Sequence, residues 1–291
     1  MIDTLYAYFV APFAEYGFMQ RALVGTLFLS LGSSPVGVFL MLRRMSLTGD
    51  AMSHAILPGV ATGFLLFGLD ILPMTLGGIA AGLVVALAAG AISRITVQRE
   101  DASLAAFYLI SLALGVLIVS LRGSTVDLMH VLFGSVLGLN DEAMLTIGII
   151  TAVTFAMLAV FWRALVAECL DPLFLRSVSR LGPAVHFVFM AIVVLNLVGG
   201  YLALGTLLSV GLMMLPAAAR FWTSRAETMA LVAIAIAAAS SVSGLLLSFH
   251  AALPAGPAIV LSAGAVYAGS LLLGTSGIIH SRTAKGHHRI A

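Results

Sequence analysis

Residues 41–70 read MLRRMSLTGDAMSHAILPGVATGFLLFGLD. Two arginines, Arg43 and Arg44, close one apolar run, and a second apolar run begins at Ala51. An apolar run of roughly 20 residues is long enough for a helix to cross the hydrocarbon core of a bilayer, which is about 30 Å thick. The stretch therefore predicts membrane-spanning helices on both sides of the arginine pair.

The composition of the whole chain agrees with this interpretation. Of 291 residues, 61% are hydrophobic and 9% are charged, and the mean hydropathy is +1.14, whereas soluble domains carry about 25% charged residues. We predict an all-α polytopic membrane protein. A single cysteine, Cys169, excludes an intrachain disulfide. The sequence has no broad basic surface that would indicate a nucleic-acid partner.

Apolar segments recur along the chain at spacings that suit a helical bundle. Nine are expected to span the membrane, with eight as the competing count because "VGGYLALG" (198–205), the connection before the seventh, is short and rich in glycine. The nine segments are residues 21–42, 51–69, 72–93, 102–121, 143–162, 183–200, 203–219, 229–248 and 257–274.

The positions of the basic residues predict the orientation of the chain. With nine spans, 12 of the 14 lysines and arginines fall on one side, and only Arg21 and Arg122 fall on the other. By the positive-inside rule the richer side faces the cytoplasm, so the N-terminus is expected outside and the C-terminus inside. The expected location is the bacterial cytoplasmic membrane, where the chain contacts membrane lipid.

The expected organisation has three parts. Residues 1–20 contain no Lys or Arg and several aromatic residues, and we interpret them as an external interfacial lead-in. Residues 21–274 form the transmembrane domain. Residues 275–291 form a basic, histidine-containing cytoplasmic tail, which is either a solvated segment or a metal-sensing one.

Asp50 and His54 form the one acid–histidine pair that the sequence places within a span. Residues at i and i+4 share a helix face. If the helix begins near Met45, His54 lies about 13 Å along it. Ionisable groups at such depth usually face a bundle interior or a water-filled path, and carboxylate with imidazole suits Zn²⁺ or Mn²⁺. The alternative is a structural hydrogen bond from Asp50 to a neighbouring helix.

The residues around the pair are expected to shape the same path. Gly49 and Ser53 flank Asp50, and Pro58 is expected to kink the helix one turn after His54, leaving a free carbonyl nearby. The chain offers only two good ligands here, whereas transition-metal sites usually have four. A two-fold dimer would bring two such pairs together.

At this point the sequence resembles a known family, the ABC-3 membrane permeases of zinc- and manganese-type ABC importers. The similar stretches occur in family order and cover nearly the whole chain, but relatives often carry an acid at the position of Ser135. They are GVFLMLRRMSLTGDAMSHAILPGVA (37–61), EDASLAAFYLISLALGVLI (100–118), DLMHVLFGSVLG (127–138), GTLLSVGLMMLPAAARFW (205–222) and LPAGPAIVL (253–261).

The resemblance implies a type II ABC importer permease fold, with Asp50 and His54 on the metal path. It also implies cytoplasmic ATPase subunits, an external metal-binding protein and a second permease copy, most simply in a homodimer. The cargo is a divalent transition metal, zinc in first place and manganese next; no permanently bound cofactor is expected.

The segment after the seventh span is expected to couple the permease to its ATPase. Pro216 interrupts the helix, Ala217, Ala218 and Ala219 are small enough to approach a partner closely, and Arg220, Phe221 and Trp222 supply charge and aromatic anchors. The alternative is an ordinary helix end.

The chain is not expected to be an enzyme. The only lysine, Lys285, follows Ala284, so no Gly-Lys-Ser/Thr of a P-loop is present. ATP hydrolysis is therefore assigned to a separate subunit. One alternative function is a stand-alone ion-coupled carrier or channel. Another is an intramembrane protease, but the sequence around Ser243 and His250 has no motif that would position a nucleophile.

Overall fold

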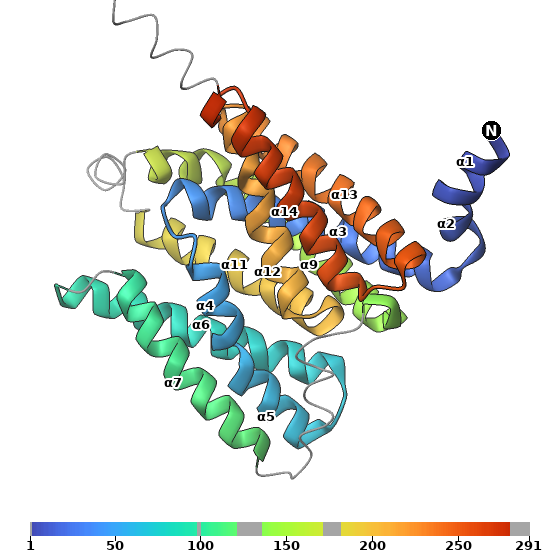
Figure 1. The fold of residues 1–291 in the computed structure, drawn as a ribbon. Coiled ribbons are helices and arrows are strands. Elements are labelled where there is room, and N and C mark those ends of the chain that lie inside the picture. Colours follow the sequence, from blue (N-terminus) through green and yellow to red (C-terminus); the bar gives the residue numbers. More distant parts are fainter. Residues whose placement is uncertain (1, 98–99, 121–135, 171–181, 280–291) are drawn as a thin grey trace, which may run out of the picture.

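The computed structural model describes residues 2–97, 100–120, 136–170 and 182–279, and these residues form helices and short connections without a β-strand (Figure 1). Most of the 122–142 connection, with His130 and Ser135, lies outside the described residues, as does the tail from 280 on. The helices are α1 (Ile2–Phe9), α2 (Ala11–Glu15), α3 (Gly17–Leu42), α4 (Thr48–Ala55), α5 (Leu57–Phe67), α6 (Ile71–Ile95), α7 (Glu100–Ser120), η1 (Val136–Gly138), α9 (Asp141–Leu170), α11 (Gly182–Leu204), α12 (Thr206–Met214), η2 (Leu215–Phe221), α13 (Ala226–Ala251) and α14 (Ala255–Leu273).

Eight helical segments in the described residues are long and apolar enough to cross a membrane, counting α4 and α5 as one. The ninth expected segment is present but shorter, as a 9-residue α-helix, α12, followed by the 7-residue 3₁₀ helix η2. Because a 3₁₀ helix rises about 2.0 Å per residue against 1.5 Å in an α-helix, the two together reach about 27 Å. This segment therefore covers nearly the depth of a bilayer core with fewer residues than an ordinary span.

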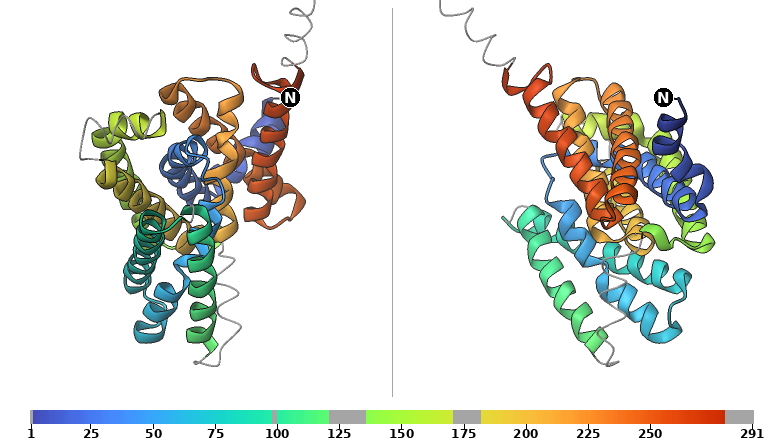
Figure 2. Two further views of the ribbon diagram at one scale, coloured as in Figure 1. Left: turned by 90° about the vertical axis from the view of Figure 1, so that its left-hand side faces the viewer. Right: turned by 45° about the vertical axis from the view of Figure 1, so that its right-hand side comes forward.

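Helices α3 and α11 lie at the centre of the molecule. In each of these two helices, 72% of an apolar 18-residue stretch is buried inside the protein. In the other six spans the corresponding share is 22–50%. Helices α9, α12 and α13 pack on α3, and α6 packs on α11. Helices α4 to α7 form a second group, at the lower left of Figure 1, which joins the rest through α6, α4 and α11 (Figures 1 and 2).

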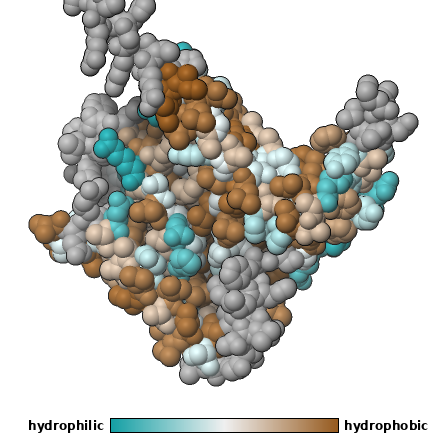
Figure 3. Space-filling model, in the orientation of Figure 1, coloured by the Kyte–Doolittle hydropathy of each residue, from teal (hydrophilic) through white to brown (hydrophobic). Residues whose placement is uncertain are grey.

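The surface of the bundle is mostly hydrophobic. Large apolar side chains are exposed on the outer helices, among them Leu109 and Ile110 of α7 and Leu261 of α14. Figure 3 shows brown hydrophobic residues over much of one face, with the hydrophilic residues in small groups. A surface of this kind is expected where lipid surrounds the protein.

Glycines allow the closest helix approaches. Gly59 of α5 faces Gly77 of α6, and a Cβ added to either residue would clash with the carbonyl oxygen of the other. Between membrane helices there is little hydrophobic driving force, so close packing of small residues supplies much of the attraction. The α5–α6 contact therefore depends on the absence of a side chain at these two positions.

We predict that Gly59→Ala weakens this contact. The added methyl group meets backbone rather than a flexible side chain, and overpacking of this kind costs about 1–3 kcal/mol. The apparent melting temperature of the purified protein in detergent should fall by several degrees. Gly269→Ala is the matched control, because nothing lies within 4 Å of a Cβ built at that helical glycine. Equal melting temperatures for the two variants would contradict the role assigned to Gly59.

Candidate metal path and coupling segment

The helix that carries Asp50 and His54 ends after eight residues and is followed by a second helix. Pro58 occupies the first turn of α5 and has no N–H, so the helical ladder cannot continue through it. The hydroxyl of Ser111 on α7 donates to the carbonyl of Ala55 at 2.8 Å, and the amide of Ile56 donates to the carbonyl of Met52. The two helices are thus separated by a one-residue interruption at Ile56, which keeps helical backbone angles.

Asp50 and His54 lie on one face of α4, as the spacing predicts. Asp50 Oδ1 and His54 Nε2 are 4.0 Å apart, too far for a hydrogen bond, and their side chains are 67% and 37% exposed. The His54 ring lies 6.2 Å from the ring of Tyr108 on α7. Because α4 begins at Thr48 and not near Met45, His54 lies about 9 Å along its helix, less deep than the expected 13 Å.

A second carboxylate shares this region. Asp50 and Asp101, the second residue of α7, line one hollow of about 200 Å³, together with Tyr108 and Thr48. The sequence interpretation did not select Asp101, although it is the second residue of the stretch 100–118 that resembles the family. The hollow therefore brings a second acid, Asp101, to the same surface as Asp50, between α4 and α7.

The described residues contain no cluster of three or more His, Cys, Asp or Glu side chains that could hold a metal ion. Asp50 and His54 therefore offer two ligands, which is fewer than a closed transition-metal site needs. Both side chains are accessible on the surface of the single chain. A metal ion bound by this pair would need further ligands besides Asp50 and His54.

Two residues that flank Asp50 have structural roles. The hydroxyl of Ser53 donates to the carbonyl of Asp50 at 2.7 Å. Gly49 packs against the side chain of Met214, and a Cβ added at Gly49 would clash with its terminal methyl group. Since Met214 is the last residue of α12, the helix with the acid–histidine pair contacts the end of α12, next to the start of η2.

The expected coupling segment is the 3₁₀ helix η2, with Pro216 in its first turn. Ala217, Ala218 and Ala219 are buried inside the chain, and Ala219 packs in a cluster with Val38 and Met229. These small residues therefore serve the packing of η2 on α3 and α13, where the sequence had suggested close approach to a partner.

The remaining residues of the segment divide into internal and exposed ones. The ring of Phe221 packs edge-on against Tyr267 of α14, 5.8 Å away, and its carbonyl accepts hydrogen bonds from Thr275 and Ser276. Arg220 is exposed and Trp222 is 45% exposed. Trp222 and Arg220, rather than Phe221, are available to a partner.

A buried charge cluster, absent from the sequence interpretation, joins the ends of three helices. Arg43 Nη2 donates to Glu168 Oε2 at 2.6 Å, and these side chains are 7% and 13% exposed. Arg43 Nη1 also lies 3.3 Å from His186 Nδ1, and the guanidinium lies over the ring of Phe189, 4.1 Å from its centre. The cluster therefore fixes α3, α9 and α11 to one another at one end of the bundle.

We predict that Glu168→Ala destabilises the protein strongly, because it leaves the Arg43 guanidinium buried without its carboxylate. Removing one partner of a buried ion pair typically costs about 3–5 kcal/mol. The matched control is Asp141→Ala, which breaks the exposed Arg21–Asp141 pair and should cost about 0–1 kcal/mol. Thermal unfolding in detergent measures both. Similar losses in the two variants would show that the Arg43 cluster contributes no more than a surface pair.

The relationship of the chain to known proteins agrees with this architecture. Residues 15–274 match the model of the ABC 3 transport family. The chain belongs to this ABC-3 family. Among similar curated proteins are the manganese import system permease protein ScaB of Streptococcus gordonii, 31% identical over 261 residues (89% of this chain and 92% of ScaB), and the chelated iron transport system membrane protein YfeC of Yersinia pestis, 31% identical over 240 residues (82% and 80%).

Solved structures show the same fold. This ABC-3 chain superposes with a TM-score of 0.84 on a chain of PsaBC from Streptococcus pneumoniae in complex with Fab, at 29% identity and covering 97% of this chain and 100% of that one. An inward-facing putative metal-chelate type ABC transporter matches with a TM-score of 0.66 at 15% identity, which supports the fold alone. The expected ABC importer permease fold is confirmed.

Proposed function

We propose that the chain is the permease subunit of an ATP-driven importer for a divalent transition metal ion. The observation that carries the proposal is the Asp50–His54 pair on a short helix that ends at the interruption at Ile56, in a chain of the ABC-3 family. Interrupted membrane helices with polar side chains are typical of sites that bind transported ions. Relatives named for manganese and iron transport support a metal cargo.

We place manganese before zinc as the physiological cargo, which reverses the order expected from the sequence. The names of the relatives refer to manganese and iron. A carboxylate with an imidazole accepts either metal, but such a pair binds Zn²⁺ more tightly than Mn²⁺. Zinc should therefore compete with manganese at Asp50 and His54 and leave the site more slowly.

The proposed transporter contains further subunits. Two ABC ATPase subunits hydrolyse ATP, an external binding protein delivers the metal, and a second copy of this chain supplies a second Asp50–His54 pair. The described part of one chain offers only the two ligands Asp50 and His54 at this position, and this supports the homodimer. We propose the cytoplasmic membrane of a bacterium as its location, with the N-terminus outside and the C-terminus inside.

The arrangement of charges supports this orientation. Arg43 lies beside Glu168 and His186, and η2 with Arg220 packs near the same end of α3. Arg21 pairs with Asp141 at the opposite end. At the helix ends that the structure describes, these basic residues thus lie at the two ends of the bundle that the positive-inside rule assigns to the inside and the outside.

We predict that Asp50→Asn and His54→Ala each abolish metal uptake while the complex still assembles, because each removes a ligand from the path. Asp101→Asn should reduce uptake on the order of tenfold, since it removes only the electrostatic attraction in the hollow. Uptake of radioactive manganese into proteoliposomes that contain the whole transporter measures all three. Asp70→Asn, at an exposed helix start, is the control.

The same assay separates the proposal from a stand-alone carrier. An importer driven by ATP loses uptake when ATP is omitted, whereas an ion-coupled carrier retains it as long as a proton or sodium gradient is present. Unchanged uptake in both the Asp50 and His54 variants would contradict the assigned path, and uptake without ATP or ATPase subunits would favour the carrier.

We predict that the exposed part of the coupling segment holds the ATPase. Trp222→Ala combined with Arg220→Glu should lower metal-stimulated ATP hydrolysis and co-purification of the ATPase, because both side chains point away from the permease core. The fold and melting temperature should persist. Ala218→Glu, by contrast, places a carboxylate at a fully buried position and should unfold the segment. Full coupling in the double variant would limit η2 to a structural helix end.

A further inference from the structure

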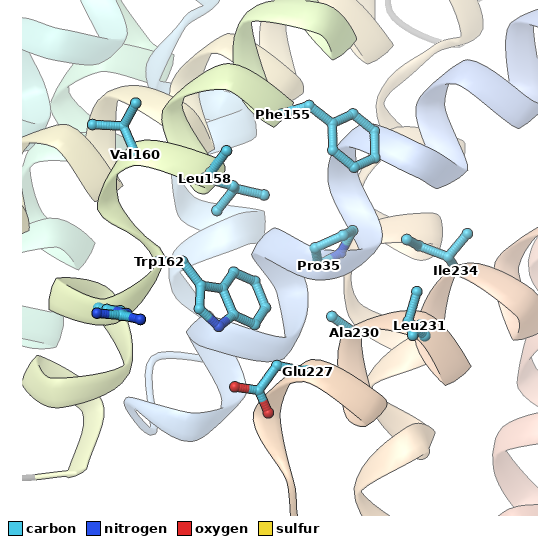
Figure 4. Close-up of a pocket in the computed structure, with 11 residues that line it drawn as sticks. Pro35, Phe155, Leu158, Val160, Trp162, Glu227, Ala230, Leu231 and Ile234 are labelled. Atoms are coloured by element: carbon cyan, nitrogen blue, oxygen red, sulfur yellow. The ribbon is translucent and has the colours of Figure 1, made fainter.

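A long apolar groove runs along the outside of the bundle between α9 and α13. Both helices pack on α3, and the space between them has a volume of about 580 Å³, within the range of about 300–1,000 Å³ that holds small molecules. Its floor includes Pro35 of α3. Figure 4 shows Pro35 between the side chains of Phe155 and Trp162 on one side and those of α13 on the other.

The walls of the groove are aliphatic and aromatic over most of its length. Leu158 and Val160 come from α9, and Ala230, Leu231 and Ile234 come from α13. Phe155 and Arg163 are eight residues apart on α9, so the apolar part extends about 12 Å from the charged end. Because α9 and α13 are both membrane-spanning candidates, this groove opens to hydrocarbon, and the group that fills it must be apolar.

Charged side chains of opposite sign stand at one end of the groove. Arg163 from α9 and Glu227 from the first turn of α13 both line it, and both are exposed. Neither forms a salt bridge with another residue that the structure describes. Figure 4 shows the Glu227 carboxylate next to the indole of Trp162. Tryptophan in a membrane protein concentrates at the depth of the lipid headgroups.

We propose that this groove is a binding site for one phospholipid with a phosphate and a primary ammonium group, that is, phosphatidylethanolamine. The guanidinium of Arg163 binds the phosphate, for which its planar fork of N–H donors is suited. The Glu227 carboxylate accepts hydrogen bonds from the ammonium group. One acyl chain lies over Pro35 between α9 and α13. A head with one anionic and one cationic group complements the two charges at the groove end.

The charge pattern favours this lipid over the other common phospholipids. The trimethylammonium group of phosphatidylcholine has no N–H to donate to Glu227, and phosphatidylglycerol has no cation. The groove also lies apart from the candidate metal path, since its lining residues belong to α3, α9 and α13 whereas Asp50 and Asp101 belong to α4 and α7. The bound lipid would hold α9 to α13, the helix that follows the coupling segment.

Native mass spectrometry of the purified full-length permease, with equal amounts of the three lipids added, tests the proposal. Wild-type protein should retain phosphatidylethanolamine in preference to the other two. Glu227→Gln should lower its retention about tenfold, to the level of phosphatidylcholine, because a charge-assisted hydrogen bond is lost. Arg163→Gln should weaken the retention of all three. Glu142→Gln, an exposed glutamate in the first turn of α9, is the control and should change nothing.

A second pair of variants tests the apolar part. Ala159→Phe fills the groove and should abolish retention of the lipid, whereas Ala235→Phe, at an exposed alanine of α13 outside the groove, should not. The number of permease copies in the particle should stay the same in both. Equal lipid retention in the two variants would overturn the proposal. Loss of a permease copy in Ala159→Phe alone would also overturn it, because the groove would then be an interface between two chains.

Discussion

The lack of hydrogen-bonding partners in hydrocarbon governs the whole structure. Every backbone amide and carbonyl at membrane depth must find a partner within the protein, which restricts the spans to helices. Where the regular helical hydrogen bonding is interrupted, serine hydroxyls donate to the backbone carbonyls instead. The hydroxyl of Ser111 donates a hydrogen bond to the carbonyl of Ala55 at the interruption after α4. The hydroxyl of Ser34 donates to the carbonyl of Leu212 near the end of α12. The two irregular regions are also the two to which we assign function.

The sequence predicted the parts that depend on local pattern. Apolar length gave the eight long spans, and the i, i+4 spacing placed Asp50 and His54 on one face. The segment 203–219 stayed ambiguous because it crosses partly as a 3₁₀ helix, whose longer rise no hydropathy pattern reveals. Asp101 was missed because it is 51 residues from Asp50 in the chain, and only the packing of α7 on α4 brings the two acids to one hollow.

The alanines of η2 show a different limit of sequence interpretation. A run of small residues allows close packing, but the run itself does not say whether the close neighbour is a partner or the same chain. Ala218 is fully buried against its own helices, so the proposed interface with the ATPase uses exposed neighbours such as Trp222. The contact between Gly49 and the side chain of Met214 places the helix of Asp50 beside the end of α12.

The buried pair of Arg43 and Glu168 has a consequence for the biogenesis of the protein. The two residues are 125 positions apart, so a ribosome that adds about 5–20 residues per second makes the arginine roughly 6–25 s before its carboxylate. During that interval the guanidinium has no buried partner, and it stays hydrated at the membrane surface, as long basic side chains at helix ends do. Helix α3 can therefore take its final position only after α9 has been inserted, which makes assembly of the bundle core a late event of synthesis.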